Sequence, residues 1–193
     1  SMNKPIFNRC GEVLHNHEAI LIFPEGNHGL KRRVRPLKKG FVSLLSHRWS
    51  IDKQPVYLSP IGVNYIKAVR FPDAVSIVYG QSHKVEPFEI NKENTHSLLW
   101  ALHEKLAVLT THIPESLDGH YNQIDAALEQ DTRLFLNPLK TNDLIAQFEH
   151  VLQSKGSLEA VASKIFKDNT DLNKSFFSRM WTLLLKRLFE FIN

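Results

Sequence analysis

Residues 25–39 combine the residue types that bind phosphate. Glu25 and Gly26 open the stretch directly after a proline, and Gly29 and Gly40 punctuate the polar residues after them. Glycines let backbone N–H groups approach an anion, and basic side chains supply the opposite charge. Six basic side chains fall within nine residues: Lys31, Arg32, Arg33, Arg35, Lys38 and Lys39. The combination suits a phosphate, although composition alone favours an ordinary solvated connection.

The elements on either side of this loop are those expected to position a ligand. Residues 19–23 form a continuous apolar run that stops at Pro24, which is typical of a strand buried on both faces in a parallel sheet. Residues 41–49 have the apolar spacing of a short helix, whose positive end would face the loop. Ligands of open parallel sheets bind beyond the carboxyl ends of the strands, so the loop lies where a site is expected.

Length and composition describe a globular chain. Its 193 residues are 42% hydrophobic and 23% charged, which argues against disorder. The single cysteine, Cys10, excludes an internal disulfide and a multi-cysteine zinc site, and favours a reducing compartment. No uncharged apolar stretch approaches the roughly 20 residues that cross a bilayer. The net charge of +4 is smaller than the charge of the loop, so the basicity is local.

Periodicity predicts an α/β chain with a helical C-terminal half. We expect a helix at 3–17, a strand at 56–65 interrupted at Pro60, and a third strand at 74–79. The predicted architecture is a core with a short, mostly parallel sheet in residues 1–113 and a helical extension in residues 114–193. The later helices are expected at 94–111, 116–135, 142–155, 158–166 and 174–192.

Two sequence blocks carry a family resemblance. Phe23-Pro24-Glu25-Gly26, with the basic stretch and Lys39-Gly40-Phe41 after it, resembles the third conserved block of the glycerolipid acyltransferases, the lysophosphatidate and glycerol-3-phosphate acyltransferases. Residues 56–63, an apolar strand centred on Pro60, resemble the fourth block. The resemblance covers residues 5–83 and leaves the C-terminal helices unexplained. Asn27-His28-Gly29 stands where the family usually has Thr-Arg-Ser, which indicates a subfamily.

The resemblance implies substrate-binding roles for four residues. In the family, the glutamate and glycine of the third block help to hold the phosphate of the acyl acceptor, so these roles pass to Glu25 and Gly26. Arg33 and Arg35 are the expected charge partners of the phosphate. A carboxylate repels a phosphate, so we expect Glu25 to accept a hydrogen bond from an acceptor hydroxyl or to orient the basic residues.

The catalytic base of the family has no counterpart in the expected place. The family uses a histidine with an aspartate five positions later, well upstream of the third block, to take the proton of the acceptor hydroxyl. Here His47 with Asp52 and His120 with Asp125 have that spacing, but both pairs come after the third block. The Ser1-Met2 start is typical of an engineered boundary, so we expect this block before residue 1. No catalytic residue is assigned, and the chain alone is expected to be inactive.

The resulting functional hypothesis is a C-terminal portion of a membrane-associated glycerophospholipid acyltransferase. The resemblance implies acyl transfer from acyl-CoA or acyl-carrier protein to lysophosphatidate or a related glycerol phosphate, at the cytoplasmic face of a membrane. It implies no metal and no other cofactor; His15 and His17 lack a third metal ligand in sequence reach. The alternative is a noncatalytic module that binds an anionic membrane surface or nucleic acid, although the loop lacks the spaced stacking aromatics of a single-strand platform. Residues 174–192 could lie in a membrane interface or pack in a core.

Overall fold

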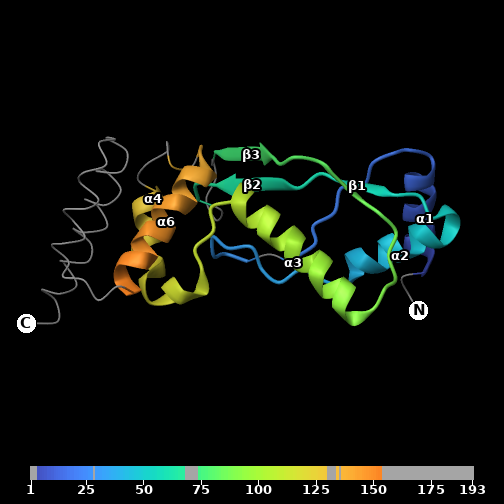
Figure 1. Cartoon of the computed structure of the whole chain (residues 1–193). Coiled ribbons are helices and arrows are strands. Elements are labelled where there is room, and N and C mark those ends of the chain that lie inside the picture. The colour runs from blue at the N-terminus through green and yellow to red at the C-terminus, as the bar shows by residue number, and fades with distance from the viewer. Residues whose placement is uncertain (1–3, 28, 68–73, 130–133, 135, 154–193) are drawn as a thin grey trace, which may run out of the picture. The chain divides into compact units, whose positions relative to one another are not determined.

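The computed structural model describes residues 4–27, 29–67, 74–129, 134 and 136–153 (Figure 1). Two helices precede four consecutive short strands, and further helices follow, so the chain is broadly α/β as predicted. The helices predicted at 158–166 and 174–192 lie outside the described residues. In chain order the elements are α1 (Lys4–His15), α2 (Gly40–Asp52), β1 (Val56–Leu58), β2 (Ile61–Tyr65), β3 (Val75–Tyr79), β4 (His83–Val85), α3 (Lys92–Leu109), the 3-10 helix η1 (Glu115–His120), α4 (Tyr121–Glu129) and α6 (Pro138–Gln153).

The chain divides into two compact units. The first unit consists of residues 1–29, 34–62 and 79–107, and the second of residues 30–33, 63–78 and 108–193. The sequence predicted a boundary at residue 113. The second unit also takes in two segments from the N-terminal half, and one of them, residues 30–33, lies inside the basic stretch.

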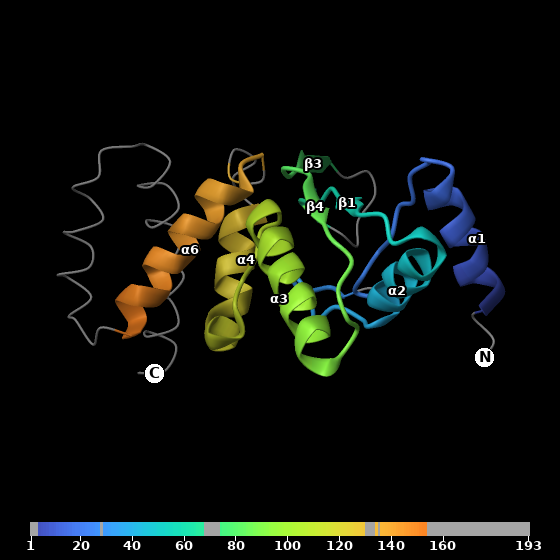
Figure 2. The same ribbon diagram turned by 45° about the vertical axis from the view of Figure 1, so that its right-hand side comes forward.

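The core of the first unit forms around α2. Buried side chains of α2, including Leu45 and Trp49, pack with Leu102 of α3, and the Trp49 ring meets Phe88 edge-on with centroids 5.0 Å apart. Helix α1 lies beside α2 in both Figures 1 and 2. Gly11 permits this close approach, because a Cβ there would lie 3.1 Å from side-chain atoms of α2. Phe7, Cys10 and Leu14 of the apolar stripe predicted for α1 pack against this core, whereas Ile6 of the same stripe is 61% exposed.

Both small sheets are antiparallel, so the predicted parallel sheet is wrong. β1 pairs with β4, with Val56 opposite Val85 and Leu58 opposite His83, and β2 pairs with β3. A parallel pair needs a crossover of a dozen or more residues, and residues 66–74 alone connect β2 to β3. Pro60 separates β1 from β2, which confirms the predicted interruption, while β4 was missed because three residues give too short a pattern.

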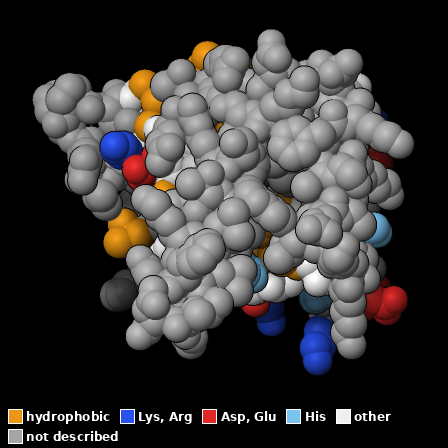
Figure 3. Space-filling view, turned by 90° about the vertical axis from the view of Figure 1, so that its left-hand side faces the viewer, with side chains coloured by type: hydrophobic (Ala, Val, Ile, Leu, Met, Phe, Trp, Pro, Cys, Tyr) orange, Lys and Arg blue, Asp and Glu red, His pale blue; other side chains and the backbone are white. Residues whose placement is uncertain are grey.

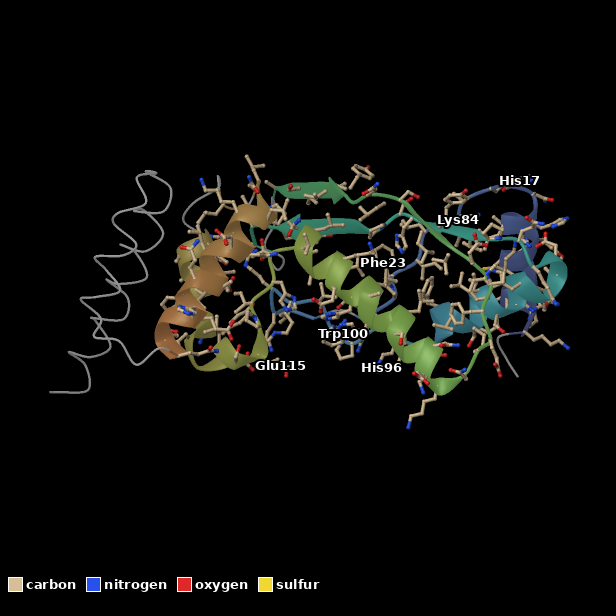
Figure 4. All side chains as sticks on the ribbon, in the orientation of Figure 1. His17, Phe23, Lys84, His96, Trp100 and Glu115 are labelled. Atoms are coloured by element: carbon tan, nitrogen blue, oxygen red, sulfur yellow. The ribbon has the colours of Figure 1, made fainter. Side chains whose placement is uncertain are left out.

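The apolar run at residues 19–23 is not a strand, and this prediction is also wrong. The segment has no regular secondary structure, and none of the backbone hydrogen bonds of the described residues begins at its N–H groups. Leu21 and Phe23 are 73% and 74% exposed (Figure 4 labels Phe23). A strand exists only where another strand pairs with it, and the described strands all pair elsewhere.

The core of the second unit is built by η1, α4 and α6. Helices α4 and α6 lie side by side in Figures 1 and 2. Ile113, Leu134 and Leu144 lie within the cluster of buried apolar residues that fills this core. Thr141 is fully buried there, and its hydroxyl donates to the Leu134 carbonyl at 2.6 Å. The helix predicted at 116–135 is divided into η1 and α4, and the helix predicted at 142–155 begins earlier, at Pro138.

Candidate phosphate-binding loop

A tight turn begins the candidate loop. The Gly26 N–H donates to the Phe23 carbonyl at 3.1 Å, which closes the turn over residues 23–26. Gly26 has φ = +74°, a left-handed conformation that other residues adopt only with strain. The Pro24 carbonyl accepts a hydrogen bond from the Lys38 N–H at 2.8 Å, so the far end of the loop returns to the turn. The conformation gives a physical reason for glycine at position 26.

Glu25 holds Arg35 in place within the first unit. One carboxylate oxygen, Oε2, accepts hydrogen bonds from both the backbone N–H and the Nε of Arg35, each at 3.1 Å. The Arg35 Nη2 donates to the Asn27 carbonyl. Both side chains are about one-third exposed or less, at 27% for Arg35 and 33% for Glu25. The structure thus brings together three of the predicted site residues, Glu25, Gly26 and Arg35, and Glu25 orients a basic residue.

Lys38 lies across the turn at Gly26. A Cβ built on Gly26 would be 3.0 Å from the Lys38 Cγ, so the lysine stem occupies the space that a side chain at position 26 would need. Lys38 is exposed, and among the described residues no hydrogen-bond or ion-pair partner contacts its ammonium group. Lys39, the N-cap residue of α2, makes no side-chain capping hydrogen bond. In the sequence, Lys38 and Lys39 are two of six basic residues, and nothing there distinguishes them from the four that form ion pairs in the structure.

Buried contacts fix the middle of the basic stretch in each unit. In the first unit, Val34 is buried and its carbonyl lies 3.2 Å from the His103 Nε2 of α3. In the second unit, the Arg33 guanidinium donates to the Ile113 carbonyl at 2.8 Å and to Asp118 at 2.5 Å. The Arg33 side chain is 10% exposed. Arg33, predicted to meet the phosphate, therefore makes structural bonds in the second unit and does not join the other three predicted residues.

Ion pairs also occupy the neighbours of Arg33. Arg32 donates from Nε to Asp125 at 2.5 Å, and its Nη1 and Nη2 reach the carbonyls of Tyr65 and Ile66 at the end of β2. Lys31 pairs with Asp118 at 3.1 Å. Hydrogen bonds from Arg33, and next from Lys31, hold the pKa of Asp118 below its ordinary value. Figure 3 shows acidic and basic side chains among the described atoms of one face.

The two His–Asp spacings found in the sequence do not form pairs. Asp52 lies 3.0 Å from the His15 Nδ1 and accepts a hydrogen bond from the buried Arg48, so its partner is not His47. The Arg48 hydrogen bond, helped by the Gln54 N–H and His15, lowers the Asp52 pKa to about 2. Asp125 pairs with Arg32, so its partner is not His120. Neither spacing yields a histidine base oriented by its aspartate.

Comparisons with known proteins leave the site residues to be interpreted by their geometry. The chain matches no protein-family model, no curated protein and no solved structure. Within the described residues, no group of three His, Cys, Asp or Glu side chains could hold a metal ion. None of the described helices is both long enough and apolar enough to cross a bilayer.

Proposed function

We propose that this chain is the part of a glycerophospholipid acyltransferase that holds the phosphate of the acyl acceptor. The reaction transfers an acyl group from acyl-CoA or acyl-carrier protein to lysophosphatidate or a related glycerol phosphate. The proposal is supported by the two sequence blocks and by the loop that the first of them forms. A location at the cytoplasmic face of a membrane, where such acceptors reside, is part of the proposal.

The observation that carries the proposal is the turn at Gly26, which gathers charged groups from both ends of the loop. Glu25 fixes the Arg35 guanidinium through its Nε, and the Nη1 donors of Arg35 have no partner among the described residues. Lys38 crosses the same turn. A fixed guanidinium and a free ammonium beside a glycine turn suit the several acceptor oxygens of a phosphate.

The loop supplies positioning and electrostatics to acyl transfer. In that reaction the acceptor hydroxyl oxygen forms a bond to the thioester carbonyl carbon, the C–S bond breaks, the thiolate leaves and a base takes the hydroxyl proton. Binding the phosphate fixes the distance from the acceptor hydroxyl to the turn, which lowers the entropic cost of attack. A positioned base contributes on the order of 100 to 10,000-fold, and no described residue is assigned that role.

The pairing of Lys31, Arg32 and Arg33 weakens the alternative of a general polyanion-binding module. Asp118, shared by Lys31 and Arg33, and Asp125 compensate two of these three charges, and Glu115 lies 3.8 Å from Arg33, so the stretch carries a smaller field than its composition suggests. Binding by counterion release requires basic residues that are free to meet successive phosphates. We therefore expect the loop to bind a small phosphate ester in preference to a polyanion.

The experiment is an NMR titration of the full chain with glycerol 3-phosphate, and with glycerol as the matched control. We expect glycerol 3-phosphate to shift the amide signals of Gly26, Arg35 and Lys38, with an affinity that falls as salt is added, and glycerol to leave them unchanged. A single-stranded oligonucleotide is added as a competitor. The proposal fails if glycerol 3-phosphate shifts none of these signals, or if the oligonucleotide binds there and glycerol 3-phosphate does not displace it.

A further inference from the structure

The basic residues of the stretch separate into paired and unpaired groups. Lys31, Arg32, Arg33 and Arg35 each bond to a carboxylate. Among the described residues, the ammonium groups of Lys38 and Lys39 have no such partner. An unpaired cation can approach an anionic ligand with all of its donors, whereas a paired one must either lose its carboxylate or use only the donors that the carboxylate leaves free. The charge available to a ligand is therefore concentrated at the end of the stretch.

The two unpaired lysines differ in how the backbone places them. The Lys38 N–H is bonded to the Pro24 carbonyl, and the Lys38 stem lies against Gly26. Lys39 is the N-cap of α2, and its carbonyl accepts the Ser43 N–H at 3.1 Å. Lys38 is therefore tied to the turn that carries Glu25, and Lys39 is tied to the helix. Lys38 and Lys39 therefore provide a test position and a control position of equal charge.

We infer that Lys38 is the residue that binds the phosphate monoester of the acceptor, and that Gly26 serves to admit its side chain. The inference rests on the proposed function and assigns its specificity to one residue. A phosphate monoester carries close to two negative charges near neutral pH, and a compact ammonium on a flexible stem can contact its oxygens as a point charge. Arg35, held by Glu25, presents its remaining donors to the same oxygens.

Gly26 and Lys38 are coupled in this arrangement. A methyl group at position 26 would lie 3.0 Å from the Lys38 Cγ, a tighter contact than most Cβ atoms make, and the φ of +74° disfavours any side chain there. Gly26→Ala must therefore displace the Lys38 stem or alter the turn. Its effect on phosphate binding should pass through Lys38.

The test compares Lys38→Gln with Lys39→Gln in the full chain, with glycerol 3-phosphate as the probe. We expect Lys38→Gln to weaken binding about tenfold, the loss typical of one charge-assisted hydrogen bond, and Lys39→Gln to weaken it less than about twofold. Equal weakening in the two variants would mean that only net charge matters and would overturn the inference. Binding unchanged in Lys38→Gln would also overturn it, while leaving the proposed function in place. A parent chain that binds no phosphate ester contradicts the proposed function itself.

Two further measurements sharpen the test. Gly26→Ala should weaken binding less in the Lys38→Gln background than in the parent chain. The reason is that the Lys38 ammonium group, which Gly26→Ala is expected to displace, is already absent. Additive losses would overturn the coupling. Inorganic phosphate is titrated in parallel, and we expect it to bind at least about threefold more weakly than glycerol 3-phosphate, which can also use its hydroxyl groups. Equal affinities would identify free phosphate as the ligand and overturn the assignment to an acceptor headgroup.

Discussion

The two ends of the basic stretch have nearly the same composition and different chemistry. Residues 31–33 belong to the second unit, where carboxylates of η1 and α4 and carbonyls near β2 and η1 surround them. Residues 35–39 belong to the first unit, where one carboxylate, Glu25, fixes Arg35, and no described residue pairs with either lysine. The same run of positive charge thus contains residues that form structural ion pairs and residues that we propose to bind a ligand. The two groups differ because folding brings Asp118 and Asp125 next to residues 31–33, whereas Glu25 alone pairs with a basic residue in 35–39 among the described residues.

The largest effect is expected within residues 31–33, whose side chains form structural ion pairs. Arg32→Ala should lower the free energy of unfolding by about 2–3 kcal/mol, because Asp125 and two carbonyls lose a donor at a side chain that is 16% exposed. Urea unfolding measures the loss. Arg9→Ala is the control, because its pair with Glu12 is exposed on α1 and should contribute less than about 0.5 kcal/mol. Equal losses of unfolding free energy in the two variants would show that the contacts of Arg32 stabilise the chain no more than an exposed surface ion pair does.

A reciprocal pair of substitutions tests the comparison directly. Arg33→Ala should destabilise the chain by about 2 kcal/mol, since its guanidinium is nearly buried on carbonyls and Asp118, and should leave glycerol 3-phosphate binding within about twofold. Arg35→Ala should show the opposite pattern, with about 1 kcal/mol of lost stability and weaker binding. Unfolding curves and titrations on the same samples give both quantities. Weaker binding in Arg33→Ala with unchanged stability would reverse the assignment.

Acid should weaken the ion pairs of Asp52, with Arg48 within α2 and with His15 of α1. The pKa of Asp52 in the folded chain, about 2, lies below its ordinary value of 3.8, so its stabilising contribution is complete above about pH 4. That contribution is lost as the pH falls from about 4 towards 2. Thermal melts of the parent chain and of Asp52→Asn, recorded across this window, should converge at the acidic end. A difference between the two that stays constant with pH would show that Asp52 acts by packing alone.

The smallest effect is expected at the two histidines with catalytic spacing. The chain with labelled acyl-CoA and lysophosphatidate should give no turnover above background, and His47→Ala and His120→Ala should change nothing. Their aspartates serve Arg48 and Arg32 instead. Turnover that disappears in either variant would show that the described chain carries its own base.

Local features of the sequence predicted what local physics determines. The spacing of Phe7, Cys10 and Leu14 predicted α1, and Pro60 predicted the break between β1 and β2. Strand pairing was mispredicted because it depends on connection length, and residues 66–74 permit only an antiparallel return.

The structural role of Arg33 could not be predicted from the residues next to it in the sequence. Its carboxylate partner, Asp118, is far away in the sequence and lies after Pro114 in a helix predicted for other reasons. A basic run alone cannot show which of its members will meet an acid after folding. Lys38 was visible as a charge, and the signal that singles it out, an amide bonded back to Pro24, exists only in three dimensions.

The exposed segment at residues 19–23 has a practical consequence for handling the protein. Five consecutive apolar residues, whose N–H groups donate to no backbone carbonyl of the described residues, match the composition of segments that stack into intermolecular sheets. Solubility should then be set by this short segment and not by the overall charge. Lowering the protein concentration and avoiding salts that strengthen apolar association would keep titration samples clear, and a light-scattering trace at each concentration would show when the limit is reached.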